Sequence, residues 1–187
     1  QPEVEATIRV TIGMAYRGLG RFAEAERHLR RAVDLRRRGL GPEHPLTLDA
    51  MNNLALVLRS QDKSSEAEKY FRQVGEARCR LSGPRHRETL VALSNLAMVL
   101  HRQQKTDEAV PLFVQCLEAS RAALGPDDPV TQSIENNFAL LLRDQGKLAD
   151  AESLFRETLQ SRERVLTADH PLTIDTLTNL ATVIFEQ

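Results

Sequence analysis

The stretch NNLALVLRSQDKSSEAEKYF, residues 52–71, determines the fold class of this chain. Apolar residues in its first half, among them Leu54 and Leu58, recur at the spacing of one face of an α-helix. The polar segment SQDKS interrupts that pattern, and the second half resumes it with Ala67 and Phe71. The stretch therefore predicts two helices joined by a tight turn.

The same two-helix unit recurs along the chain. The linker motif GPEHPLT begins at residue 41, and its counterparts GPRHRET, GPDDPVT and TADHPLT begin at residues 83, 125 and 167, each 42 residues after the last. A repeated unit of this length predicts a solenoid, because one hairpin cannot bury its apolar face alone. We expect an all-α fold of about nine helices in one domain, 1–187, with repeats at about 5–46, 47–88, 89–130 and 131–172 and a half repeat at 173–187.

Composition narrows the functional classes. The chain carries 25 basic and 26 acidic residues, so it has no basic field for a phosphate backbone, and we expect no nucleic-acid partner. No apolar run approaches the length of a membrane span, and we expect no direct membrane insertion.

The cysteines and the first residue bear on the cellular compartment of the protein and on the extent of the chain. Cys79 and Cys116 fit no metal or redox spacing, and neither a signal-peptide pattern nor a glycosylation acceptor occurs. We therefore expect a reducing, cytoplasmic (intracellular) location. Because the chain begins at Gln1 without a Met, we also expect it to be part of a longer protein.

The stretch 52–71 resembles the tetratricopeptide repeat. The segments LGPDDPVT (124–131) and ENNFALLLRDQGKLADAESLF (135–155) are similar to its longer, 42-residue variety. That variety occurs in kinesin light chains, in nephrocystin-3-like proteins and in the sensor arrays of NTPase-based signalling proteins. The resemblance implies a right-handed superhelix whose first helices line a concave groove for peptides or partner helices, with no catalytic activity and no cofactor.

Each repeat is predicted to have a first and a second helix, and three rows of residues share one face of the first helices. Asn53, Leu56 and Arg59 are spaced i, i+3 and i+6, and the same spacing recurs in the following repeats. An asparagine amide both donates and accepts, so it suits the backbone of an extended peptide, a role that the resemblance also implies. We predict a peptide-binding groove made of three rows of residues. The asparagine row is Asn53, Asn95 and Asn137, and the apolar row is Leu56, Met98 and Leu140, with Met14 beside them. The basic row is Arg59, His101 and Arg143.

The groove predicts the chemistry of its partner. The apolar row would hold one or two apolar side chains, and the basic row would pair with carboxylates. A protein or peptide segment with an apolar anchor and acidic neighbours is therefore favoured.

Each row also has a purely structural interpretation. The asparagines could bond a neighbouring helix, and Leu56 and Met98 could be buried by the adjoining repeats. Arg59 and Arg143 lie near helix C-termini, where the helix dipole alone favours a cation.

We expect no metal, no cofactor and no catalytic residue. His44, His86 and His170 share one register, but successive repeats are separated by about 8–10 Å, whereas zinc ligands lie within about 2.0–2.3 Å of the ion. Polar helix starts explain these histidines better. No nucleophile motif or phosphate-binding loop occurs, and the runs Arg36–Arg38 and Arg85–Arg87 are interpreted as solvated helix ends.

The sequence therefore indicates a protein–protein interaction scaffold or adaptor and not an enzyme. Two alternatives remain open. One is an architectural element that holds neighbours in a large assembly through its outer face. The other is the sensor array of a larger NTPase-type signalling protein.

Overall fold

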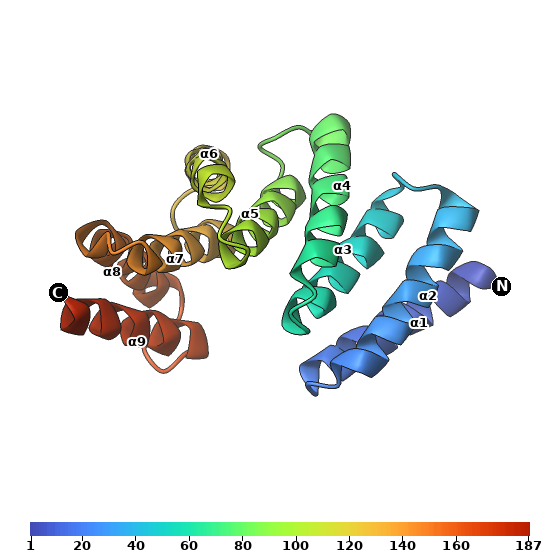
Figure 1. Cartoon of the computed structure of the whole chain (residues 1–187), viewed down its shortest axis with the longest axis horizontal. Helices are drawn as coiled ribbons and strands as arrows, with labels where there is room; N and C mark the ends of the chain where they lie inside the picture. Colours follow the sequence, from blue (N-terminus) through green and yellow to red (C-terminus); the bar gives the residue numbers. More distant parts are fainter. The chain divides into compact units, whose positions relative to one another are not determined.

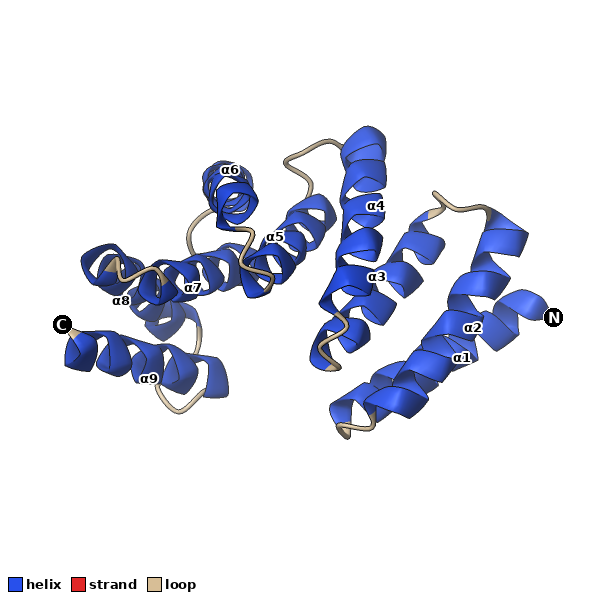
Figure 2. Cartoon of the chain, in the orientation of Figure 1, coloured by secondary structure: helices blue, strands red, loops and turns tan.

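The computed structural model describes residues 1–187 and contains nine α-helices and no strand, joined by short loops (Figures 1 and 2). The predicted all-α class is confirmed. The helices are α1 (Pro2–Gly18), α2 (Phe22–Leu40), α3 (Pro45–Ser60), α4 (Ser64–Ser82), α5 (Arg87–Arg102), α6 (Thr106–Leu124), α7 (Pro129–Asp144), α8 (Leu148–Val165) and α9 (Pro171–Glu186).

The helices form two compact units. Gln1–Gly83 holds α1 to α4, and Pro84–Gln187 holds α5 to α9. Within each unit consecutive helices pack on one another, and successive first helices also touch: α1 contacts α3, α5 contacts α7, and α7 contacts α9. The boundary falls in the linker predicted to separate the second repeat from the third.

The second, third and fourth hairpins share a core of two alanines and one phenylalanine. Ala55 of α3 and Ala67 and Phe71 of α4 are fully buried, because two alanines let the helices approach and the ring fills the remaining space. The same three positions are fully buried in the next two hairpins, as Ala97, Ala109 and Phe113 and as Ala139, Ala151 and Phe155.

The first hairpin solves the same packing problem with different residues. Gly13 of α1 stands at the alanine position, and Leu29 of α2 at the phenylalanine position. A Cβ built on Gly13 would lie 2.7 Å from Leu29 Cγ and 3.3 Å from the carbonyl oxygen of Ala25. Helices α1 and α2 are therefore packed too closely for any side chain at residue 13.

Tight turns of one type join the helices of every hairpin. Gly20, Asp62, Gln104 and Gly146, 42 residues apart, have φ values of 72°, 60°, 60° and 74°. In the second repeat Lys63 N–H donates to Leu58 O at 3.0 Å and Asp62 N–H to Arg59 O at 3.1 Å. These bonds satisfy carbonyls that the end of a helix leaves unpaired, and they require a left-handed residue at the turn.

The linker motif begins each following helix. Asp128 Oδ1 accepts from Val130 N–H at 2.8 Å, and the Nδ1 atoms of His44 and His170 accept from Leu46 and Leu172 N–H, each at 3.2 Å. A proline follows each of these caps at a position where it loses no hydrogen bond. His44 and His170 thus serve as helix caps.

One expectation about the charged runs is wrong. Arg36 was expected on a solvated helix end, but it is buried, and its Nη1 donates to the carbonyl oxygen of Leu46 at 2.7 Å. Arg162 of α8 makes the same contact with Leu172 at 2.6 Å. In both cases the guanidinium links the C-terminal part of a second helix to a backbone carbonyl in the first turn of the following first helix.

We expect Gly13→Ala to lower the free energy of unfolding by about 1–3 kcal/mol, because the added methyl overpacks the α1–α2 contact. Urea denaturation of the full chain measures the change. Gly39→Ala in α2 is the matched control, since a Cβ there meets no atom within 4 Å. That variant should gain up to about 1 kcal/mol from helix propensity. A similar shift in both variants would contradict the close approach.

We expect Gln104→Gly to raise the free energy of unfolding by about 1 kcal/mol, because a non-glycine residue at φ 60° is strained. Gln104→Ala keeps that strain and should stay within about 0.5 kcal/mol of the parent chain. Thermal unfolding of the three chains side by side checks the difference, and equal melting temperatures for the two variants would refute it.

Candidate functional site

The predicted groove residues lie on the first helices α3, α5 and α7. Asn53, Leu56 and Arg59 of α3 are half-buried, while Leu54 and Leu58 on the core side of the same helix are buried completely. The counterparts on α5 and α7 are half-buried as well: Asn95, Met98, His101, Asn137, Leu140 and Arg143. All three rows therefore keep part of their surface outside the core.

The asparagine side chains differ from their neighbours in hydrogen bonding. No hydrogen bond within the chain involves the amides of Asn53 or Asn137. In the second unit the preceding residue makes a contact between first helices, since Asn136 Oδ1 accepts from Thr176 Oγ1 of α9 at 3.5 Å. The amides of Asn53 and Asn137 keep their full bonding capacity.

The apolar row runs across adjacent helices in the second unit. Met98 lies on α5 and Leu140 on α7, and these two helices contact each other. Both side chains are half-buried, so neighbouring repeats cover them only in part.

The basic row of the second unit is already engaged. His101 Nε2 lies 3.0 Å from Asp144 Oδ2, and Arg143 Nη2 lies 3.0 Å from Asp144 Oδ1. Asp144 ends α7 at a position where earlier repeats have Ser60 and Arg102, so a comparison of aligned columns gave no reason to single it out. An acidic ligand would have to compete with this carboxylate.

The structure also contains three hollows that the sequence analysis missed. Each is formed by a linker, the following first helix and the second helix after it, and the three lie 42 residues apart along the chain. The preceding second helix adds Arg37 to the first hollow and Arg121 to the third. Their volumes are about 400, 410 and 350 Å³. We name them the first, middle and third hollow, and no residue of the predicted groove lines any of them.

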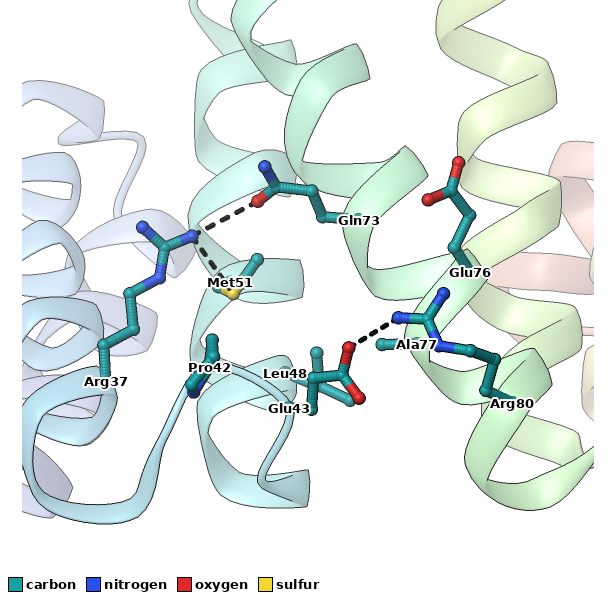
Figure 3. Close-up of a pocket in the computed structure, with 9 residues that line it drawn as sticks. All are labelled: Arg37, Pro42, Glu43, Leu48, Met51, Gln73, Glu76, Ala77 and Arg80. Atoms are coloured by element: carbon teal, nitrogen blue, oxygen red, sulfur yellow. Dashed lines mark hydrogen bonds and ion pairs between the residues drawn. The ribbon is translucent and has the colours of Figure 1, made fainter.

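The first hollow belongs to the first unit and is bridged by an ion pair (Figure 3). Arg80 Nη2 lies 2.5 Å from Glu43 Oε1, across the floor made by Leu48 and Met51. On the other side Arg37 Nη2 donates to the side-chain oxygen of Gln73 at 3.2 Å. Four of the polar side chains around this floor therefore pair with one another, while Glu76 makes no hydrogen bond or ion pair within the protein.

The third hollow, in the second unit, has the same ion pair and a more polar floor. Arg164 Nη2 lies 2.5 Å from Asp127 Oδ1. Glu135 replaces the Met51 of the first hollow, is 2% exposed, and lies 2.7 Å from Arg121 Nη2. Burial raises the pKa of Glu135, and the hydrogen bond from Arg121 only partly opposes that shift.

Two further features bear on function: groups of metal-binding side chains and helices able to span a membrane. No three or more His, Cys, Asp or Glu side chains are grouped so that they could hold a metal ion. None of the nine helices combines the length and the apolar character needed to cross a lipid bilayer.

Comparison with known proteins identifies the repeat. Family models described as Tetratricopeptide repeat match residues 4–80, 89–130 and 134–172. The chain belongs to the tetratricopeptide repeat family. No curated protein matches the sequence.

Solved structures share the fold of this tetratricopeptide repeat chain. The nearly identical TPR-like repeats of a kinesin light chain candidate from Podosopora anserina superpose with a TM-score of 0.80 at 20% identity, covering 99% of this chain and 87% of that one. A point variant of the same repeats gives a TM-score of 0.81 at 21% identity, with 98% and 86% coverage. BtubC (BKLC) from P. vanneervenii gives 0.76 at 18% identity, with 92% and 69% coverage.

We expect Glu135→Leu to stabilise the protein at pH 7 by about 1 kcal/mol or more, because it replaces a buried carboxylate with an apolar side chain. A raised pKa means that the folded state binds the proton more tightly than the unfolded state does. The parent chain therefore loses stability as the pH rises from the usual glutamate value through the folded pKa.

The gain should accordingly be larger at pH 7 than at pH 4, and melting temperatures measured at both values check this. Leu93→Ile, at the equivalent position of α5, is a control that removes no titratable group. A gain for Glu135→Leu that does not depend on pH would rule out the buried charge as its cause.

Proposed function

We propose that this chain is a protein-interaction scaffold that binds a peptide or a segment of a partner protein on the partly exposed faces of its first helices. Tetratricopeptide repeats generally bind protein partners and generally lack catalytic activity. The observation that carries the proposal is the half-exposed state of all three rows, beside helix faces that are fully buried.

The amides provide the sequence-independent part of binding. Asn53 and Asn137 make no hydrogen bond inside the protein, so each can donate to a ligand carbonyl and accept from a ligand N–H. An extended segment exposes both groups at every residue. The asparagine row therefore suits a backbone in any sequence context.

The apolar row provides most of the affinity. Met98 and Leu140 lie on contacting helices and retain exposed surface that a ligand side chain would cover. Burying one large apolar side chain contributes roughly 1.5–3 kcal/mol. One or two anchors of this kind are enough for a specific but exchangeable complex.

The basic row contributes selectivity. An acidic residue of the ligand would replace Asp144 beside His101 and Arg143, so charge pairs are exchanged and few new ones are created. Exposed pairs contribute only about 0–1 kcal/mol each. Acidic neighbours of the anchor therefore favour encounter and exclude basic segments more than they add affinity.

The proposal also covers the location and the class of partner. We propose that the scaffold acts in the cytoplasm without a cofactor, a metal or a reaction of its own. Its nearly equal numbers of basic and acidic residues favour protein partners over nucleic acid.

The test uses a 12-residue peptide selected from a random displayed library on the full chain. Leu140→Asp should weaken its binding about tenfold or more, since it puts a charge in the anchor position. Asn137→Ala removes only the amide and should weaken binding about two- to tenfold. Isothermal titration calorimetry measures both changes.

Val114→Asp on α6 is the matched control, because Val114 is 39% exposed and lies outside the rows. It should bind the peptide as the parent chain does. Circular dichroism confirms that each variant is folded. Folded row variants that bind with unchanged affinity would overturn the proposal and move the partner surface to the outer helices, as in the architectural alternative.

A further inference from the structure

The three hollows occupy equivalent places in their repeats, but the middle one differs from the other two at one pair of charged positions. In the first hollow Glu43 of the linker pairs with Arg80 of α4, and in the third hollow Asp127 pairs with Arg164 of α8. The middle hollow has Arg85 and Ala122 at these two positions. The acid of the linker has become a base, and its partner on the second helix has lost its charge.

This exchange leaves the middle hollow without its bridging ion pair. Arg85 is exposed and has no acidic partner in the structure, and Ala122 cannot extend across the opening. The side chain of Gln115 likewise makes no hydrogen bond, whereas its counterpart Gln73 accepts one from Arg37. The polar groups on this rim are unsatisfied by the protein itself.

The floor of the middle hollow is apolar. Leu90 and Leu93 of α5 and Ala119 of α6 line it. In the third hollow Glu135 and Ser161 stand at the positions of Leu93 and Ala119. The volume of the middle hollow, about 410 Å³, is near the lower end of the range found for ligand pockets, roughly 300–1,000 Å³. One or two side chains of a partner would fill it.

We propose that the middle hollow is a second docking site, which binds a short segment of a partner protein containing an apolar side chain next to an acidic one. The apolar side chain packs on Leu93 and Ala119. The neighbouring carboxylate pairs with Arg85, which no acid of the chain neutralises.

The rim also sets the direction of the segment. Glu118 lines the same hollow and, like Arg85, has no partner within the protein. It repels an acid on its side, so the favoured order places the carboxylate toward the linker and a neutral or basic residue toward α6. Gln115 donates to and accepts from the segment between them.

The site is distinct from the one under the proposed function, because it uses the linker and the second helix in place of the first-helix rows. The probes are two capped peptides, Ac-GDLGG-NH2 and Ac-GKLGG-NH2, titrated into the ¹⁵N-labelled full chain. We expect the aspartate peptide to shift amide resonances of residues 84–93 and 115–122, and the lysine peptide to bind about fivefold or more weakly.

Exchange variants test the cause. Arg85→Glu combined with Ala122→Arg recreates the ion pair of the other hollows and should weaken binding about tenfold. The reciprocal variant, Glu43→Arg with Arg80→Ala, removes that pair from the first hollow and should create binding there. Arg85, Ala122, Glu43 and Arg80 are all exposed, and circular dichroism verifies that both variants remain folded.

Three results would overturn the proposal: no shifts with either peptide, shifts confined to the rows around Met98 and Leu140, or parent-like binding by the Arg85→Glu, Ala122→Arg chain. Leu140→Asp separates the two sites. It should weaken binding of the library-selected peptide about tenfold or more and leave the titration with Ac-GDLGG-NH2 unchanged.

Discussion

The close contact between the two helices of each hairpin is the constraint on which the rest of the structure depends. A first helix can approach a second one only where the facing residue is small, as at Ala55 against Phe71, and in the tightest case only where it is glycine, as at Gly13 against Leu29. Close packing of this kind is sensitive to a single methylene. Helix register, turn position and linker length must all preserve it, and each recurs every 42 residues.

The same constraint separates structural positions from positions available for binding. Residues at the hairpin contact are completely buried and have no freedom to bind anything else. Asn53 and Leu56 occupy other faces of the same helix and are only half-buried, and Arg85 lies in a linker. Partner surfaces in such a fold can vary from repeat to repeat without disturbing the packing, as the change from Glu43 to Arg85 to Asp127 illustrates.

Prediction from sequence succeeded where a property depends on neighbours in the chain. The two-helix unit and its turn near Asp62 depend on a few successive residues, and the 42-residue register located the linkers that begin at residues 41, 83, 125 and 167. It failed where elements distant in sequence meet. Arg36 belongs to a charged run, yet its guanidinium is buried against Leu46 O, and Asp144 proved to engage both His101 and Arg143. The hollows escaped notice because each combines a linker with two or three helices.

The sequence by itself determined the family, the helical repeat and the residues that form each hairpin core, because these follow from periodicity and from residue size. Only the tertiary structure decided which polar groups satisfy one another. An ion pair such as Arg80 with Glu43 joins residues 37 positions apart, and its absence at Arg85 and Ala122 has meaning only once the two positions are known to line one hollow. Charge and hydrogen bonding act over a few ångströms in space, and the order of residues along a chain does not record that distance.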